Sequence, residues 1–148
     1  MSSNKAVVGA ASELLANTYT LYLKTQNYHW NVTGPMFNTL HSLFEQQYTE
    51  LAQAADEIAE RIRALGEYAP GSYAEFAKLA TIEEAKPDTR AGDMVRKLTE
   101  DHALLAQTAK ALIDAGTEAG DDVSVDLGVR RMDFHQKNGW MLRSHLES

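Results

Sequence analysis

The sequence contains no cysteine. This absence excludes disulfide bonds, thiolate metal sites and thiol nucleophiles together, so any redox chemistry must use a metal ion or a bound cofactor. Long apolar runs are also missing, whereas a membrane-spanning helix needs about 20 apolar residues in succession. The first residues, MSSNKAVVGA, lack the apolar core of a secretion signal. These absences predict a cytoplasmic protein that makes no contact with a membrane.

Positive charge is scarce as well. The chain has 14 lysines and arginines against 21 aspartates and glutamates, which gives a formal net charge of −7. An acidic surface repels phosphate backbones and gathers cations. The composition therefore argues against nucleic acid as the main partner and is compatible with a cationic one.

What the sequence does contain is helical periodicity over the length of one domain, residues 1–148. With prolines only at 35, 70 and 87, long helices are predicted over residues 4–31, 37–65 and 90–119. A fourth runs to residue 146 and is capped by Asp121 or Asp122. A short amphipathic segment, residues 72–80, lies within the one long connection. Two short connections that flank a long one indicate an all-α, ferritin-like four-helix bundle, with a short extra helix in the crossover between helices 2 and 3.

The second predicted helix carries two distinct faces. One is an apolar stripe expected in the core: Leu40, Phe44, Tyr48, Leu51, Ala55, Ile58, Ile62 and Leu65. A neighbouring face carries His41, Glu45, Asp56 and Glu60, with the small residues Thr49 and Ala52 between the two pairs. Each pair has i,i+4 spacing and can converge on one ion. His41 and Asp56, however, lie about 22 Å apart along a straight helix, so within one chain they cannot share a metal whose ligand bonds are about 2 Å long.

Two explanations of these pairs remain open. Either the two pairs are unrelated half-sites, or a second copy of the chain supplies the missing ligands to each pair. In an isologous dimer with antiparallel second helices, His41 and Glu45 of one chain face Asp56 and Glu60 of the other. His29 would join His41 across the turn at Gly34 and Pro35.

Each residue also has a more ordinary explanation. Charged helix faces are usually solvated, and a lone histidine is more often a surface or capping residue than a ligand. We therefore expect His102, His135 and His145 to be surface or capping residues. Trp30 and Trp140 are expected to be packing anchors.

Several motifs resemble one known family. They are "NYHWNVTGPMFNTLH" followed by "QAADEIAERIRALG", then "GDDVSVD" and "WMLR" around the last helix. Together they resemble the Dps family, the mini-ferritins first described as DNA-binding proteins from starved cells, over nearly the whole chain. The resemblance implies a dodecameric shell built from twofold dimers, with iron oxidised between paired subunits. Carried across by motif, the metal ligands and catalytic residues are His29, His41, Glu45, Asp56 and Glu60. Glu45 stands where the family usually has aspartate.

The resemblance also implies a function. The chain would be a ferroxidase that oxidises Fe²⁺ with H₂O₂, or more slowly with O₂, and stores ferric mineral, protecting DNA and the cell from oxidative stress. Imidazoles and carboxylates suit Fe²⁺ and Fe³⁺, with Zn²⁺ as a competitor. Asp122 and Asp126 would line a pore that admits iron, although Asp122 is equally explained as a helix cap and Arg130 adds positive charge nearby. Trp30 would trap stray oxidising equivalents.

Two other functions compete with this one. A di-iron site inside each bundle needs Glu-x-x-His motifs, and the residues three before the histidines are Gln26, Asn38, Thr99, Met132 and Leu142. That rival is excluded. The alternative is a DNA-compacting structural protein, associated with the bacterial nucleoid, whose ferroxidase sites are weak or vestigial. Only one lysine, Lys5, lies in the first 23 residues, so DNA binding is expected to be weak.

Overall fold

Five helices and no strands make up residues 2–146, the part of the chain that the computed structural model describes. The helices are α1 (Ser2–Asn31), α2 (Phe37–Ala64), α3 (Tyr73–Leu79), α4 (Ala91–Ala119) and α5 (Asp122–Ser144). Every predicted helix is present, with ends within two residues of those expected. The all-α prediction is confirmed. Among the described helices, none combines the length and the apolar character needed to cross a membrane.

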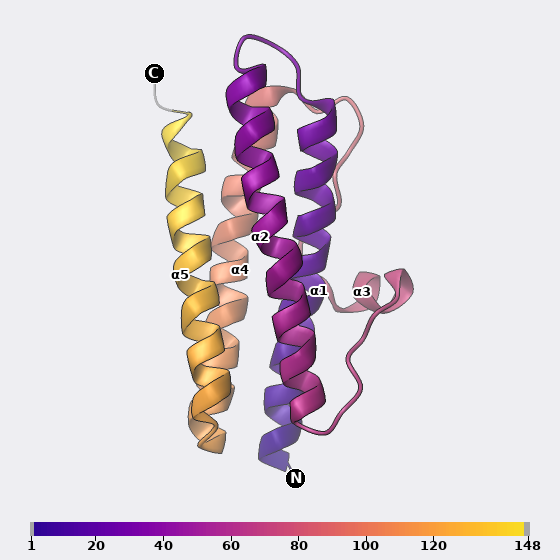
Figure 1. Cartoon of the computed structure of the whole chain (residues 1–148), viewed down its shortest axis with the longest axis vertical. Coiled ribbons are helices and arrows are strands. Elements are labelled where there is room, and N and C mark those ends of the chain that lie inside the picture. Colours follow the sequence, from indigo (N-terminus) through magenta and orange to yellow (C-terminus); the bar gives the residue numbers. More distant parts are fainter. Residues whose placement is uncertain (1, 147–148) are drawn as a thin grey trace.

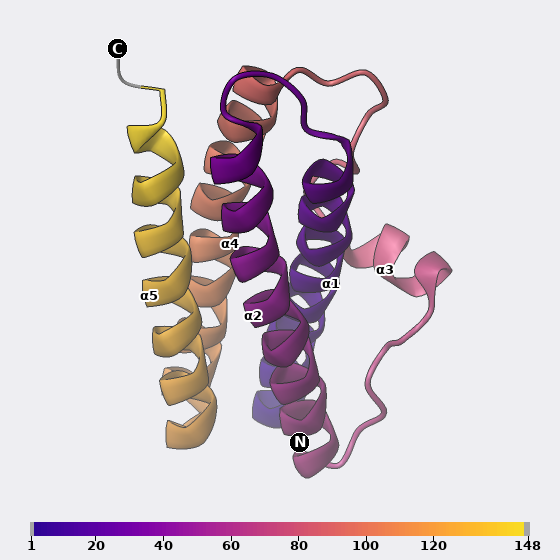
Figure 2. The ribbon, with the colours of Figure 1, turned by 45° about the horizontal axis from the view of Figure 1, so that its top comes forward.

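The four long helices form a bundle, and the connection from α2 to α4 runs along the full length of that bundle (Figure 1). α1 and α2 are antiparallel and joined by a tight turn. The segment 65–90 then returns along the outside of the bundle, so α4 runs parallel to α2, and α5 is antiparallel to α4 (Figure 1). The short helix α3 lies beside α1, outside the bundle (Figure 2). This is the ferritin-like arrangement predicted from the connection lengths.

Residues with special backbone conformations set the helix ends. Gly34, Gly66 and Gly120 have φ angles of 108°, 97° and 69°, which glycine adopts without a steric penalty. Gly120 ends α4 in the left-handed conformation that commonly closes helices. Immediately after it, Asp121 caps α5 by accepting a hydrogen bond from the Ser124 backbone N–H at 3.1 Å. Of the two candidate caps, the structure therefore selects Asp121, and Asp122 stands in the first turn.

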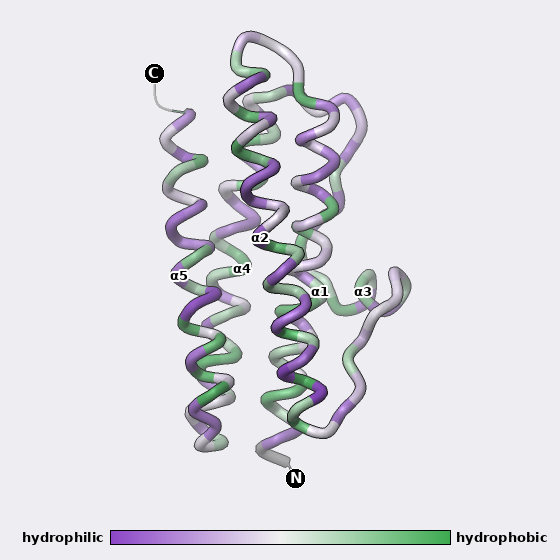
Figure 3. The backbone as a smooth tube through the Cα atoms, in the orientation of Figure 1, coloured by the Kyte–Doolittle hydropathy of each residue, from purple (hydrophilic) through white to green (hydrophobic). Residues whose placement is uncertain are grey.

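Apolar side chains of all four long helices fill the bundle. Hydrophobic and hydrophilic residues are interspersed along the helices (Figure 3), and the amphipathic pattern is clearest in α2 and α4. The stripe predicted on α2 is buried at six positions, Leu40, Phe44, Leu51, Ala55, Ile58 and Ile62, while Tyr48 and Leu65 are only half-buried. Polar side chains from α2, α4 and α5 are also buried, among them Gln47, His102, Arg131 and His135.

α4 and α5 approach each other closely at Gly128. A Cβ atom added there would lie 2.7 Å from the Ile113 side chain and 3.1 Å from the Ala109 carbonyl oxygen. We expect Gly128→Ala to lower the free energy of unfolding by about 1–3 kcal/mol, because overpacking forces the two helices apart. The measurement is urea unfolding followed by circular dichroism.

Gly9 on α1 provides the matched control. It is exposed, and a Cβ atom there would meet nothing within 4 Å. Gly9→Ala should therefore stabilise the helix by up to about 1 kcal/mol through helix propensity alone. Equal effects of the two substitutions would contradict the close approach at Gly128.

Candidate metal centre

Two histidine rings from different helices lie face to face at one end of the bundle. His29 belongs to the last turn of α1 and His41 to the second turn of α2. The turn that contains Gly34 brings them together, and their ring centroids are 3.8 Å apart with an angle of 13° between the planes. His29 is buried and His41 is half-buried. The structure thus joins the two histidines that the sequence separates by eleven residues.

Backbone carbonyls fix the tautomer of both rings. The Nδ1 atom of His29 lies 2.6 Å from the His41 carbonyl oxygen, and the Nδ1 atom of His41 lies 2.7 Å from the His29 carbonyl oxygen. A carbonyl can only accept, so each neutral ring donates its proton from Nδ1 and keeps a lone pair on Nε2. A second hydrogen bond of this kind is what orients metal-binding histidines. The pair therefore offers two oriented nitrogen ligands.

Three carboxylates of α2 are exposed and free of ion pairs with the described residues: Glu45, Asp56 and Glu60. Other carboxylates of the same helix are engaged. Glu50 pairs with the buried Arg131, and Glu57 pairs with Arg130 at 2.8 Å. The arginines of α5 thus neutralise one side of α2 and leave negative charge on the other. Such uncompensated carboxylates attract cations.

One chain does not complete a metal site. Within residues 2–146, no group of three or more potential ligands is close enough to hold one ion. Because α2 is a continuous helix, it keeps His41 and Asp56 about 22 Å apart. We call His29, His41 and Glu45 the histidine half-site, and Asp56 and Glu60 the carboxylate half-site. Each chain carries one of each, at separate places on α2.

The carboxylate half-site borders an open groove of about 540 Å³ between α1, α2 and α3. Asp56 and the small residues Ala52 and Ala59 line it from α2, and Tyr19 and Phe76 line it from α1 and α3. Asp56, a predicted metal ligand, therefore lies in a hollow of the surface rather than on a ridge.

The remaining predicted site residues lie elsewhere. Asp122 is exposed at the start of α5, and Asp126 pairs with Arg130 at 3.0 Å. Arg130 also binds Glu57, so two carboxylates balance the positive charge noted in the sequence. Trp30 and Trp140 are 61% and 56% exposed. Within the single chain, the prediction that these tryptophans are packing anchors is wrong.

Sequence reasoning missed a second histidine pair, in the bundle interior. His102 and His135 are fully buried, and their Nδ1 atoms are 2.9 Å apart. Burial lowers the pKa of His102 to about 3 and the pKa of His135 well below its ordinary value, and the positive charge of Arg131 acts in the same direction. The prediction that both are surface or capping residues is wrong. Their helical spacing from Leu98, Leu105 and Leu142 was the available signal.

Comparisons with known proteins agree with this architecture. A ferritin-like domain model matches residues 9–148. The chain is 34% identical to DNA protection during starvation protein 2 of Bacillus anthracis, over 97% of this chain and 98% of the relative.

Two solved structures extend the likeness to the fold. The crystal structure of a Dps protein from Bacillus brevis superimposes with a TM-score of 0.96 at 34% identity, covering 99% of both chains. A Dps protein from Vibrio cholerae O1, described as a member of the ferritin-like diiron-carboxylate superfamily, gives 0.94 at 29% identity, covering 99% of this chain and 92% of that one.

Proposed function

Because the chain belongs to the Dps family of ferritin-like proteins, we propose that it is an iron-storing ferroxidase. It oxidises Fe²⁺ with hydrogen peroxide, or more slowly with dioxygen, and keeps the ferric product as mineral inside a dodecameric shell. Removing iron and peroxide together protects DNA and the cell. The relative named for DNA protection and the neighbour described as a diiron-carboxylate protein support this proposal.

The observation that carries the proposal is the stacked pair His29 and His41. Both Nδ1 atoms are held by carbonyl oxygens, so both Nε2 atoms are free for a metal. A centre needs more ligands than residues 2–146 of one chain bring together. We infer that an antiparallel, twofold pairing of α2 helices sets the histidine half-site of one chain against the carboxylate half-site of its partner. The small, exposed residues Thr49 and Ala52 between the half-sites would allow the helices to approach.

The ligand chemistry suits iron oxidation. Two neutral imidazoles and three carboxylates form a hard, anionic set that binds Fe²⁺ and holds Fe³⁺ more tightly, which favours oxidation. Peroxide accepts two electrons: 2 Fe²⁺ + H₂O₂ + 2 H⁺ → 2 Fe³⁺ + 2 H₂O. Each copy carries a net charge of −7, so an assembled shell attracts Fe²⁺. Zn²⁺ would compete for the same ligands.

Iron oxidation kinetics test the proposal. The protein is loaded with Fe²⁺ without oxygen, and oxidation is followed optically after peroxide or air is added. We expect fast oxidation with peroxide in the wild type, and His41→Ala should slow it by about tenfold or more, since even the residues that orient metal ligands contribute 10–100-fold. His145→Ala, which alters a histidine near the end of α5 outside both half-sites, is the control and should keep the wild-type rate.

A wild type that oxidises iron no faster than buffer would contradict the proposal and favour the DNA-compacting alternative.

Further parts of the proposal are that Asp122 and Asp126 line the pore that admits iron and that the exposed Trp30 intercepts oxidising equivalents. DNA binding itself should be weak at physiological salt, because the chain is acidic. A gel-shift assay across salt concentrations measures this directly.

A further inference from the structure

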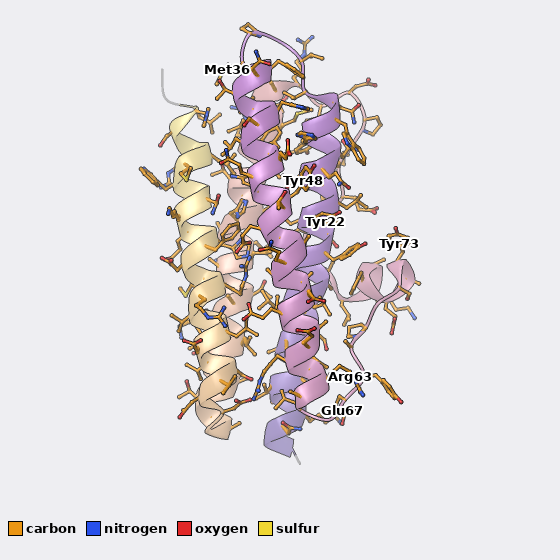
Figure 4. All side chains as sticks on the ribbon, viewed as in Figure 1. Tyr22, Met36, Tyr48, Arg63, Glu67 and Tyr73 are labelled. Carbon is orange, nitrogen blue, oxygen red and sulfur yellow. The ribbon has the colours of Figure 1, made fainter. Side chains whose placement is uncertain are left out.

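The ring of Phe37 lies on the outer face of His41. Phe37 is the first residue of α2, and its ring centroid is 4.9 Å from that of His41, with 21° between the two planes. His29 covers the opposite face of His41 at 3.8 Å and 13°. Three rings therefore form one stack, in the order Phe37, His41, His29. Figure 4 labels Met36, the residue before Phe37, at this end of the bundle.

Phe37 and His41 have the i,i+4 spacing that brings side chains together on a helix. Helical side chains lean toward the N-terminus of their helix, so the imidazole of His41 lies over the turn that carries Phe37. The contact is therefore set by α2 itself, within a single chain. It does not depend on how a second chain packs.

Core packing and helix capping do not account for Phe37. Its side chain is 38% exposed, and within residues 2–146 it belongs to neither of the two clusters of buried apolar side chains. The starts of helices favour capping side chains and acidic residues. α2 begins differently, since Met36 at the cap position makes no side-chain hydrogen bond and the first turn has no acidic residue. The contact with His41 gives this apolar start a purpose.

A histidine ligand needs contacts that fix the plane of its ring, because rotation about the bond to the imidazole has no sharp preference. The hydrogen bond from Nδ1 of His41 to the His29 carbonyl oxygen, 2.7 Å long, holds one edge of the ring. The ring can still pivot about that bond unless both of its faces are covered. His29 is buried, and the ring of Tyr48 meets it edge-on at 5.2 Å. His41 is only half-buried, and Phe37 covers its outer face.

We propose that Phe37 is a positioning residue for the metal centre, which holds the ring of His41 against His29 so that Nε2 points at the metal. This inference rests on the proposed function. The phenyl ring has no lone pair and binds no metal itself. With Nδ1 bonded and both faces covered, His41 presents its Nε2 edge to a ligand. Without the phenyl ring, His41 adopts other orientations, and the centre binds metal more weakly although the chain stays folded.

Co²⁺, which is not oxidised under these conditions, tests the proposal independently of iron oxidation. The whole protein is titrated without oxygen, and binding is followed by visible absorption and calorimetry. The signal that His41→Ala abolishes reports the centre. Phe37→Ala should weaken this binding by about 3–10-fold, as loss of an aromatic pair implies. Phe37→Leu, which keeps apolar bulk without a flat ring, should also weaken it, and Phe37→Tyr should restore the wild-type affinity.

Two further measurements separate positioning from a general loss of structure. Metal-free crystal structures should show the His41 ring displaced in Phe37→Ala and in place in Phe37→Tyr. Alanine is a better helix former than phenylalanine, so urea unfolding of Phe37→Ala should stay close to that of the wild type. In peroxide-driven Fe²⁺ oxidation, Phe37→Ala should raise KM for Fe²⁺ more than it lowers kcat.

Met36→Ala is the matched control. Met36 is 41% exposed and precedes Phe37 in the chain, so this variant removes an apolar side chain of similar exposure and should keep the wild-type Co²⁺ affinity. Wild-type affinity in Phe37→Ala, an equal loss in Met36→Ala, or no recovery in Phe37→Tyr would overturn the positioning role. Rapid iron oxidation by the wild type would then leave the proposed function intact. A wild type that neither binds Co²⁺ through His41 nor oxidises iron would overturn both.

Discussion

Subunits carrying His41→Ala and subunits carrying Asp56→Ala have no intact ferroxidase centre when each is assembled alone, and they are expected to regain about a quarter of the wild-type number of centres when they are refolded together in equal amounts. The number follows from twofold pairing. About half of the dimers contain one chain of each kind, and each of these has one centre with all its ligands and one with both lesions. The measurement is the rate of peroxide-driven Fe²⁺ oxidation per chain, before and after mixing.

A matched mixture separates shared centres from other causes of recovery. His29→Ala and His41→Ala both damage the histidine half-site, so every centre in their mixture lacks a ligand and no activity should return. Recovery in this mixture, or none in the first, would contradict the shared centre. The continuous α2 helix is the reason for expecting a large effect, because it leaves no way for His41 to reach Asp56 of its own chain.

We expect the protein to lose stability steeply in acid because of the buried pair His102 and His135. The pKa of His102 is lowered from 6.5 to about 3 by burial and by Arg131. Between these two pH values the unfolded chain binds a proton at this position and the folded chain does not. The free energy of unfolding therefore falls by about 1.4 kcal/mol for each pH unit below about 6.5, for each such histidine. Above about pH 6.5 this contribution to stability is complete.

Within residues 2–146, neither ring of the pair has a carboxylate as a hydrogen-bond or ion-pair partner that would stabilise its protonated form. Each ring has the other as its hydrogen-bond partner, and among the described residues the Nε2 atoms of both have none. The aromatic ring of Phe134 and the guanidinium group of Arg131 lie nearby, and Arg131 repels an added proton. With two such histidines, the free energy of unfolding falls more in acid than it would with a single one.

Urea unfolding at about pH 7 and about pH 5 measures this slope. His102→Gln removes one titrating group and should flatten the dependence, even if it lowers stability at neutral pH. His145→Gln alters a histidine that lies outside the core and should leave the wild-type slope. A wild type and a His102→Gln variant with the same slope would contradict the assignment.

The fold could be predicted because glycine and proline mark the helix ends. Gly66 follows Leu65, the residue that caps α2, and Gly120 stands directly after the end of α4. Pro35 lies in the turn between α1 and α2. The meeting of His29 and His41 was also predictable, since a turn of a few residues leaves the ends of α1 and α2 side by side. Both predictions depend only on residues close in sequence.

Features that depend on distant residues could not be predicted in the same way. His102 and His135 come from different helices, and sequence periodicity does not say which side chains meet across a bundle. α5 buries polar residues such as Arg131 and Asn138, so its apolar pattern is weak. The choice of Asp121 over Asp122 as cap depends on the backbone angles of a single residue. Pairing of the half-sites requires a second chain, and it remains a prediction.

The crossover along the outside of the bundle has a consequence for how the chain folds. α1 with α2, and α4 with α5, are helical hairpins with short turns that form from local contacts. Contacts between the hairpins join residues far apart in sequence, as in the hydrogen bond from Asn17 to Thr108 and the ion pair of Lys24 with Asp101. The chain must lose the entropy of closing a long loop before these distant contacts can contribute favourable free energy. Docking of the two preformed hairpins should therefore limit the refolding rate.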